Sequence, residues 1–220
     1  MKENMNEFIL VIGNKNYSSW SLRPWLVLKY FQIPFEEIFI PLRQPDSKGK
    51  ILQYSPSGQV PVLKHNQVTV WDSIAICEYL NDLFPEKGLW PRQVKARAWA
   101  RAISAEMHAG FMALRKNCPV DIKAKKAIRE RTPDVDKDIQ RIIAIWEECR
   151  DRFQKDGDFL FGSFSIADAM FAPVIFRFQT YGIASELSGI GRKYFETMFN
   201  LPVMQEWAEQ AARETQVIAH

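Results

Sequence analysis

The chain has few cysteines and no Cys-x-x-Cys pair. Its three cysteines are widely spaced: Cys77, Cys118 and Cys149. An odd number at such spacing does not suggest a disulfide framework, and a free cysteine behaves as a small hydrophobic side chain. We therefore expect three reduced, mostly buried thiols.

Long apolar segments and clusters of like charge are also missing. No stretch approaches the roughly eighteen apolar residues of a membrane helix, and the opening MKENMNEF lacks the apolar part of a signal peptide. We therefore predict a cytoplasmic protein with no membrane partner. The net charge is only +3, with no run of about five like charges, so the sequence does not predict nucleic-acid binding.

Histidines are scarce as well. His65, His108 and His220 stand far apart, and no metal-ligand spacing is present. We therefore predict that the protein holds no metal.

Apolar residues are plentiful, at 47% of 220 residues, and their pattern in the first part of the chain alternates between strand and helix. A short apolar run at residues 8–12 predicts a buried strand, followed by a helix over 22–31 with Pro24 in its first turn and a second strand over 35–40. A short helical or irregular stretch over 47–52, a hairpin over 60–71 and a helix from Ser73 come next. This β-α-β-α-β-β-α order is the thioredoxin-like layout, with its first two strands parallel.

Strand patterns disappear after the Pro/Gly-rich residues 84–91. Apolar spacing predicts one long helix over 93–116, a second beginning at Thr132-Pro133, a third capped by Ser165 and Asp168 and running to Tyr181, and a last one over 202–213. We therefore expect an α/β domain over residues 1–84, a linker over 85–92 and an all-helical domain over 93–220.

The hairpin and the helix after it carry features that suit a ligand. Pro61 cannot donate a ladder hydrogen bond, which leaves the backbone of Val60 open to an extended partner. Asp72 and Ser73 are good N-caps, and the free N–H groups of a helix start suit a carboxylate. Together they fit a small peptide with a terminal carboxylate. Alternatively, Pro61 only prevents a further strand from pairing at the edge of the sheet, and Asp72 or Ser73 only caps the helix.

These residues carry a family resemblance. Gly58-Gln59-Val60-Pro61-Val62-Leu63, followed by Trp71-Asp72-Ser73-Ile74-Ala75-Ile76, resembles the glutathione-binding signature of the cytosolic glutathione S-transferases. The resemblance implies a cis Pro61, a glutathione cysteine paired with the Val60 backbone beside Gln59, and a γ-glutamyl group held by Asp72 and Ser73. With the helical half and its Ser-x-x-Asp box, it covers essentially the whole chain. It implies the fold of that family, an N-terminal thioredoxin-like domain followed by an all-α domain, and a homodimer.

The chemistry of thioredoxin-like folds takes place in the loop after the first strand, here Tyr17-Ser18-Ser19-Trp20-Ser21. Hydroxyls stand where redox enzymes carry cysteines, so the reactive thiol must come from the ligand. A glutathione thiol resembles a free cysteine, with a pKa of about 8.5. A hydroxyl hydrogen bond to the charged sulfur contributes about 1.5 to 3 kcal/mol, which lowers that pKa by about one to two units.

The loop is similar to the Ser-Ser-Cys motif of the zeta-class transferases, including bacterial zeta-like members, and its first serine matches Ser18. This similarity implies that Ser18 is the catalytic residue, that Ser19 is its neighbour in the glutathione site and that Ser21 is the helix cap. Tyr17 is a rival for the catalytic role, and a purely structural role for all three serines stays open. Trp20 replaces the zeta cysteine, which weakens the case for a zeta-like glutathione-dependent isomerase.

A pocket for the second substrate is expected between this loop and the first helix of the second domain. His108, Met112 and Arg115 would share one face of that helix. Alternatively, Met112 belongs to the core, Arg115 is solvated and His108 is structural. The sequence thus predicts an enzyme, a glutathione transferase with a detoxification role, that activates its co-substrate glutathione against a small, hydrophobic electrophile. A non-catalytic ligand carrier or protein adaptor is the alternative.

Overall fold

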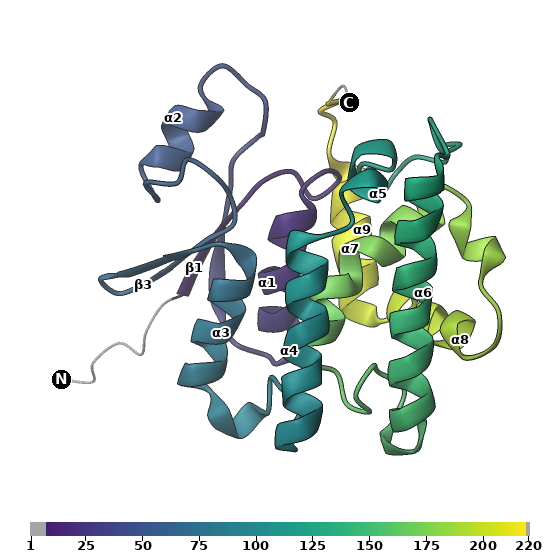
Figure 1. Cartoon of the computed structure of the whole chain (residues 1–220). Coiled ribbons are helices and arrows are strands. Elements are labelled where there is room, and N and C mark those ends of the chain that lie inside the picture. The colour runs from purple at the N-terminus through teal and green to yellow at the C-terminus, as the bar shows by residue number, and fades with distance from the viewer. Residues whose placement is uncertain (1–7, 219–220) are drawn as a thin grey trace.

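The first part of the chain folds around a four-stranded sheet, and the rest is helical (Figure 1). The structure, a computed structural model, describes residues 8–218, so His220 lies outside the described residues. The elements of the first part, in chain order, are β1 (Phe8–Ile12), α1 (Ser19–Tyr30), β2 (Phe35–Phe39), α2 (Ser47–Leu52), β3 (Val62–His65), β4 (Val68–Trp71) and α3 (Ser73–Leu83). This is the predicted thioredoxin-like order.

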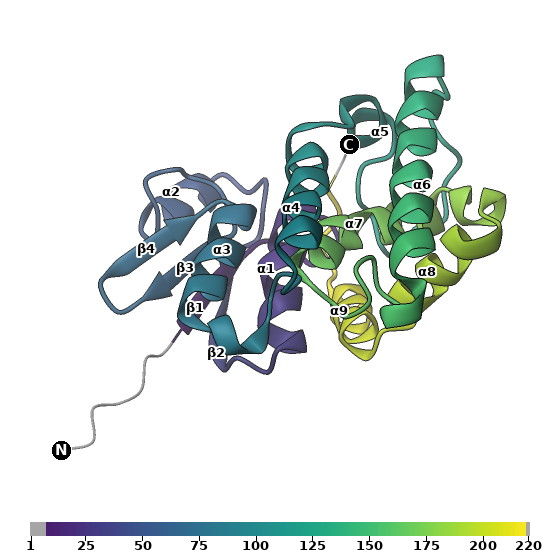
Figure 2. The same cartoon turned by 60° about the horizontal axis from the view of Figure 1, so that its bottom comes forward.

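The strands lie in the order β2-β1-β3-β4, with β1 and β2 parallel and both other pairs antiparallel. Because β1 is an interior strand beneath helices, its sequence is a continuous apolar run rather than an alternating one. The β3–β4 turn is made by Asn66 and Gln67, and Asn66 takes the positive φ of 55° that such turns need. Figure 2 shows α1 lying between the sheet and the helical half.

The position of Pro61 explains how a proline sits beside an interior strand. The first ladder pair of β3 joins Val62 to Val11, so Pro61 lies one residue outside the ladder. The Val60–Pro61 peptide bond is cis, as the family resemblance implied.

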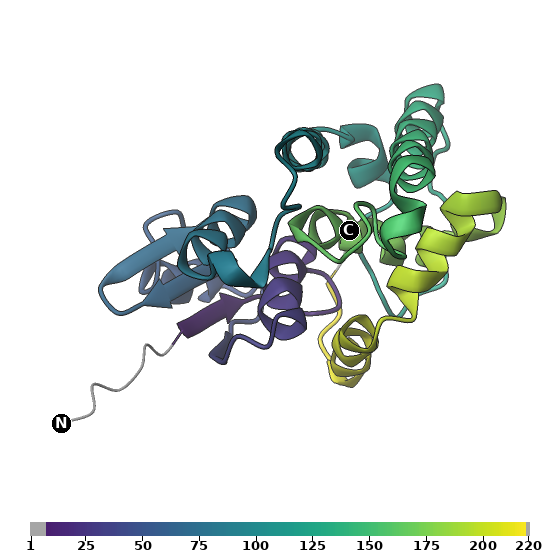
Figure 3. The same cartoon turned by 90° about the horizontal axis from the view of Figure 1, so that it is seen from below.

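The second part of the chain is all-helical. Its main helices are α4 (Val94–Ala109), α5 (Met112–Asn117), α6 (Pro133–Phe153), α7 (Ile166–Thr180), α8 (Gly189–Phe199) and α9 (Pro202–Arg213). Helix α7 is buried on nearly all sides, because it runs through the middle of the molecule (Figure 3). The predicted capping box is present at its start. Asp168 accepts hydrogen bonds from the Ser165 and Leu160 amides at 2.8 and 3.0 Å, and burial raises the pKa of its carboxyl to about 6.

Two helix predictions are wrong, and one helix was missed. The expected helix over 93–116 is broken, because α4 ends at Ala109 and Phe111 takes a φ of 61° before α5 starts. Arg115 stabilises the break by donating to the carbonyls of Gly110, at 2.9 Å, and Met107. Helix α1 starts at Ser19, so Pro24 is its sixth residue and lies beyond the first turn. Helix α8 had not been predicted.

One apolar core runs through both halves of the molecule. Trp25 of α1 meets Trp207 of α9 edge-on at 5.0 Å, and Tyr30 of α1 stacks on Phe164 at 4.0 Å. Helix α1 is therefore held between the sheet and the helical half, and so is the loop that precedes it. The boundary predicted at residues 85–92 stays a prediction.

The three cysteines are buried, as predicted, and burial raises the pKa of each thiol. Within residues 8–218, no helix is both long and apolar enough to cross a bilayer.

Candidate active site

A cleft of about 1010 Å³ opens beside the loop between β1 and α1. Six of the residues predicted for the glutathione site line it: Ser18, Gln59, Val60, Pro61, Asp72 and Ser73. They come from three segments, the loop that caps α1, the approach to β3 and the turn from β4 into α3. Ser19 is buried in the first turn of α1 and is not among the residues that line the cleft.

Asp72 caps α3 and faces a histidine from the helical half. Its Oδ1 accepts from the amides of Ile74 and Ala75 at 2.9 and 3.3 Å, while its Oδ2 lies 3.1 Å from Nε2 of His108. Burial lowers the pKa of His108 even though Asp72 opposes that shift, so at neutral pH the uncharged ring donates from Nε2. This hydrogen bond connects the sheet half of the site to α4.

Ser73 lies at the bottom of the cleft and is only 1% exposed. Its hydroxyl accepts from Nη1 of Arg23 at 3.4 Å, and Nε of the same arginine donates to the carbonyl of Met170 in α7 at 3.2 Å. Arg23 is fully buried. Burial, with Arg115 and Arg177 nearby, lowers the pKa of its guanidinium. A cation therefore stands directly behind the serine that the family resemblance assigns to the γ-glutamyl group.

Ser18, and not Ser21, is the N-cap of α1, which corrects the predicted cap. The Ser18 hydroxyl oxygen accepts from the Ser21 amide at 3.3 Å, and the hydroxyl donates to Ser21 Oγ at 2.7 Å. Ser21 Oγ also accepts from the Gly13 amide at 3.2 Å. The two hydroxyls thus form a short chain that leads from the end of β1 toward the cleft.

Trp20 lines the cleft and is enclosed by three basic side chains. The guanidiniums of Arg23 and Arg115 lie 4.4 and 4.9 Å from its ring centroid, and the His108 ring meets it edge-on at 5.2 Å. Cation–π contacts of this kind help to hold the indole in place. Among the described residues, Nη2 of Arg23 and Nδ1 of His108 are buried without a hydrogen-bond partner.

The residues predicted for the second-substrate pocket are only partly brought together. His108 and Arg115 both lie against Trp20, whereas Met112 begins α5 and is 67% exposed. The helix break places His108 in α4 but Met112 and Arg115 in α5, where only Arg115 turns back to contact Trp20. The alternative assignments of Met112 to the core and of Arg115 to solvent are also wrong, because Arg115 is partly buried and bound to carbonyls.

Sequence reasoning missed other residues of the cleft. Arg43, Gln44 and Lys48 line it beside α2, and Ile218 lines it from the far end of the chain. Lys48 lies in the stretch 47–52, which was predicted as short helix or irregular, and its positive charge could have been considered for the site. Nothing in the local sequence pointed to Ile218.

Comparison with known proteins agrees with this fold. Residues 17–83 match the profile of the glutathione S-transferase N-terminal domain, and residues 126–209 match that of the glutathione S-transferase C-terminal domain. The chain therefore belongs to the glutathione S-transferase family.

Individual relatives are distant. Glutathione S-transferase omega-2 of Rattus norvegicus is 29% identical over 180 residues, covering 81% of this chain and 69% of that protein. A probable maleylacetoacetate isomerase of Caenorhabditis elegans is 32% identical over 96 residues, 44% of each chain. The family is thus established, but the zeta-like class expected from the sequence is not singled out.

Solved structures share the fold. A glutathione transferase homologue from Burkholderia gl BGR1, solved with bound glutathione, superimposes with a TM-score of 0.71 at 21% identity, covering 96% of this chain and all of that one. Glutathione transferase Omega 3C from Trametes versicolor gives 0.70 at 17% identity, covering 91% and 88%.

Proposed function

We propose that the protein is a glutathione transferase whose cleft holds glutathione with its thiol beside Ser18. The proposal rests on one observation: the Ser18 hydroxyl, Val60 and the Asp72–Ser73 pair line the same cleft. Asp72 offers a carboxylate to the γ-glutamyl ammonium, and Ser73 with the start of α3 offers donors to the adjacent carboxylate. The Val60 backbone would pair with the cysteinyl unit.

The charges at the other end of the cleft suit the rest of a tripeptide. Arg43 and Lys48 line the cleft on the α2 side, away from Asp72. Glutathione carries its glycine carboxylate at the end opposite the γ-glutamyl group. We therefore assign that carboxylate to the α2 side, where cations attract it.

The hydrogen bond between the Ser18 and Ser21 hydroxyls allows Ser18 to donate a hydrogen bond to a thiolate. Hydroxyl hydrogens rotate freely to suit their partners. When a thiolate lies beside Ser18, Ser18 donates to the sulfur, and Ser21 turns to donate to Ser18 Oγ while it still accepts from the Gly13 amide. No heavy atom needs to move. The serine stays protonated, because it stabilises the sulfur anion and does not itself attack.

The size of this effect is sufficient for catalysis. A hydrogen bond to a charged group contributes about 1.5 to 3 kcal/mol, or about one to two pKa units. A thiol with an ordinary pKa of about 8.5 then has a pKa of about 6.5 to 7.5, so a substantial fraction is thiolate at neutral pH. The start of α1 acts in the same direction through its free amides. The thiolate would attack a small electrophile that enters beside Trp20.

Replacing Ser18 by Ala tests this role. We expect the pKa of bound glutathione, measured by titrating thiolate ultraviolet absorbance, to rise by about one to two units. Ser19→Ala is the matched control, because Ser19 is adjacent in sequence but does not line the cleft. An unchanged titration in Ser18→Ala would remove Ser18 from the role and leave Tyr17, which also lines the cleft, as the candidate.

A non-catalytic ligand carrier or protein adaptor is the competing function. Assays with and without glutathione, across aryl halides, hydroperoxides and isomerisable dienes, separate the two. Glutathione-dependent turnover supports the enzyme, and binding without turnover of any of these substrates supports the carrier. Turnover of the dienes alone would favour the isomerase activity named for the Caenorhabditis elegans relative.

We also propose a homodimer in the cytoplasm with a role in detoxification. The exposed side chain of Val68, on the edge strand β4, is available to a second copy. Sedimentation of the purified protein would report the mass of one chain or two.

A further inference from the structure

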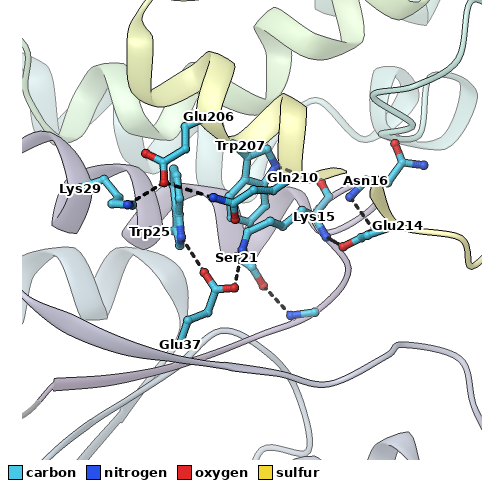
Figure 4. Close-up of polar contacts among 11 residues, drawn as sticks. Lys15, Asn16, Ser21, Trp25, Lys29, Glu37, Glu206, Trp207, Gln210 and Glu214 are labelled. Carbon is cyan, nitrogen blue, oxygen red and sulfur yellow. Dashed lines mark hydrogen bonds and ion pairs between the residues drawn. The ribbon is translucent and has the colours of Figure 1, made fainter. Parts of the chain in front are cut away.

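The loop that carries Ser18 is bound by the last described residues of the chain. Glu214 lies just after α9, and its two carboxylate oxygens accept from consecutive backbone amides of the loop. Oε1 accepts from the Lys15 amide at 2.6 Å and Oε2 accepts from the Asn16 amide at 3.2 Å (Figure 4). A carboxylate that bridges two amides makes charge-assisted hydrogen bonds, which are about twice as strong as neutral ones.

A second set of contacts from the same segment closes a ring. Asn14 accepts from the Leu42 amide at 2.8 Å and donates to Oε1 of Gln216 at 3.0 Å. Gln216 in turn donates to the carbonyl of Leu42 at 2.7 Å. The side-chain amides of Asn14 and Gln216 and the backbone of Leu42 therefore form a closed ring of hydrogen bonds. This ring connects the loop, the segment before α2 and the segment 214–218.

The side chain of Lys15 fixes the same loop from its other side. Lys15 is only 5% exposed, and its ammonium lies 5.6 and 5.2 Å from the ring centroids of Trp25 and Trp207 while pairing with Glu37 (Figure 4). Trp207 also donates from Nε1 to the Lys15 carbonyl at 2.9 Å. The helical half therefore holds both the backbone and the side chain of this loop residue.

The contacts of Glu214 and Gln216 are connected to Ser18 by one backbone turn that begins at Asn14. The amides of Tyr17 and Ser18 both donate to the carbonyl of Asn14, at 3.1 and 2.7 Å. Asn14 is the residue held by Gln216, and the next two residues are held by Glu214. The position of the Ser18 hydroxyl in the cleft thus depends on contacts made some two hundred residues later in the chain.

We infer that Glu214 is a positioning residue for the thiol chemistry, acting through the Asn14–Asn16 turn to hold Ser18 against bound glutathione. The inference rests on the proposed function, because it concerns the hydroxyl assigned to the thiolate. Glu214 itself does not line the cleft, whereas Ile218 of the same segment does. The segment therefore both orients the serine and forms part of the wall.

Glu214→Gln is the test variant, because it keeps the size of the side chain but turns one acceptor into a donor that faces an amide. We expect the pKa of bound glutathione to rise by about half a unit or more, equivalent to about a threefold loss in the ratio of thiolate to thiol. Affinity for S-methylglutathione, which has no thiol to ionise, should stay within about twofold of the wild type. A merely structural role would lower thermal stability and leave the thiol pKa unchanged.

The controls keep the outcomes separate. Glu209→Gln removes an exposed carboxylate from α9 and should change neither quantity. Gln216→Ala removes the hydrogen bonds to Asn14 and Leu42. The same measurements are made on this variant if Glu214→Gln does not fold. Amide hydrogen exchange at Lys15 and Asn16 should accelerate in Glu214→Gln.

Unchanged exchange, or an unchanged thiol pKa while Ser18→Ala shifts it, would overturn the inference and leave the proposed function standing. If Ser18→Ala shifts nothing, the proposed function fails, and the role of Glu214 in thiol chemistry fails with it.

Discussion

Asp72 uses its two carboxylate oxygens for two different tasks. Oδ1 caps α3, and Oδ2 faces His108 at the edge of the cleft. Its backbone has φ 75° and ψ 135°, and asparagine is the replacement closest to aspartate in shape. An Asp72→Asn variant would therefore keep the cap and the backbone while removing the charge.

Asp72→Asn is expected to weaken glutathione binding with little change in stability. Loss of a hydrogen bond to a charged group costs about 1.5 to 3 kcal/mol, or about tenfold to a hundredfold in affinity. Titration calorimetry gives the affinity, and a thermal melt gives the stability. Asp82→Asn, an exposed change in the same helix, serves as the control. Equal affinity in Asp72→Asn and wild type would contradict the assigned role.

Among the helices, the break between α4 and α5 places Arg115 beside Trp20, which lines the cleft. A continuous helix would extend α4 past Gly110 and carry Arg115 away from the carbonyls that it now binds. Gly110 permits the break, because a Cβ at this position would lie 2.8 Å from the carbonyl oxygen of Glu106. The contact between Arg115 and Trp20 thus depends on a glycine in the connection between α4 and α5.

Gly110→Ala should destabilise the protein and Gly49→Ala should stabilise it. The first forces a methyl group against a backbone carbonyl, at a cost of about 1 to 3 kcal/mol. The second adds a methyl group inside α2 with nothing within 4 Å, which favours the helix by about 0.5 to 1 kcal/mol. Denaturant unfolding measures both. Two changes of the same sign would show that local packing is not the deciding factor.

At the scale of the whole molecule, the two halves share one core, and the loop of the proposed active site lies where they meet. Trp207 belongs to α9, yet it is fully buried against Trp25 of α1 and bonded to the Lys15 carbonyl. We therefore expect the molecule to unfold as one unit, in spite of its two-domain sequence pattern.

Trp207→Ala should lower the free energy of unfolding by about 3 to 5 kcal/mol. Far-ultraviolet and near-ultraviolet circular dichroism should still report a single coincident transition, because loss of the contact weakens both halves together. Val203→Ala, a partly buried change in the same helix, should cost less. Two separated transitions in the wild-type protein would contradict a shared cohesive core.

The local sequence determined most of the elements and six of the residues that line the cleft. Strand, turn and cap signals are encoded within a few residues, so the hairpin, the start of α3 and the Ser165–Asp168 box could be predicted. The break after Ala109 could not, because apolar spacing continues across it and its stabilisation by Arg115 depends on how the chain folds back. The cap of α1 was misassigned because three serines offer equivalent hydroxyls and only the backbone geometry distinguishes them.

The sequence by itself thus determined the fold class and six of the residues that line the cleft. Only the tertiary structure decided that Arg23 stands behind Ser73, and that Glu214 and Gln216 bind the loop of Ser18. The physical reason is the separation along the sequence of the residues that make contact. Caps and strands depend on neighbours within a few residues, whereas these contacts join residues between 50 and 202 positions apart, a proximity that packing alone creates.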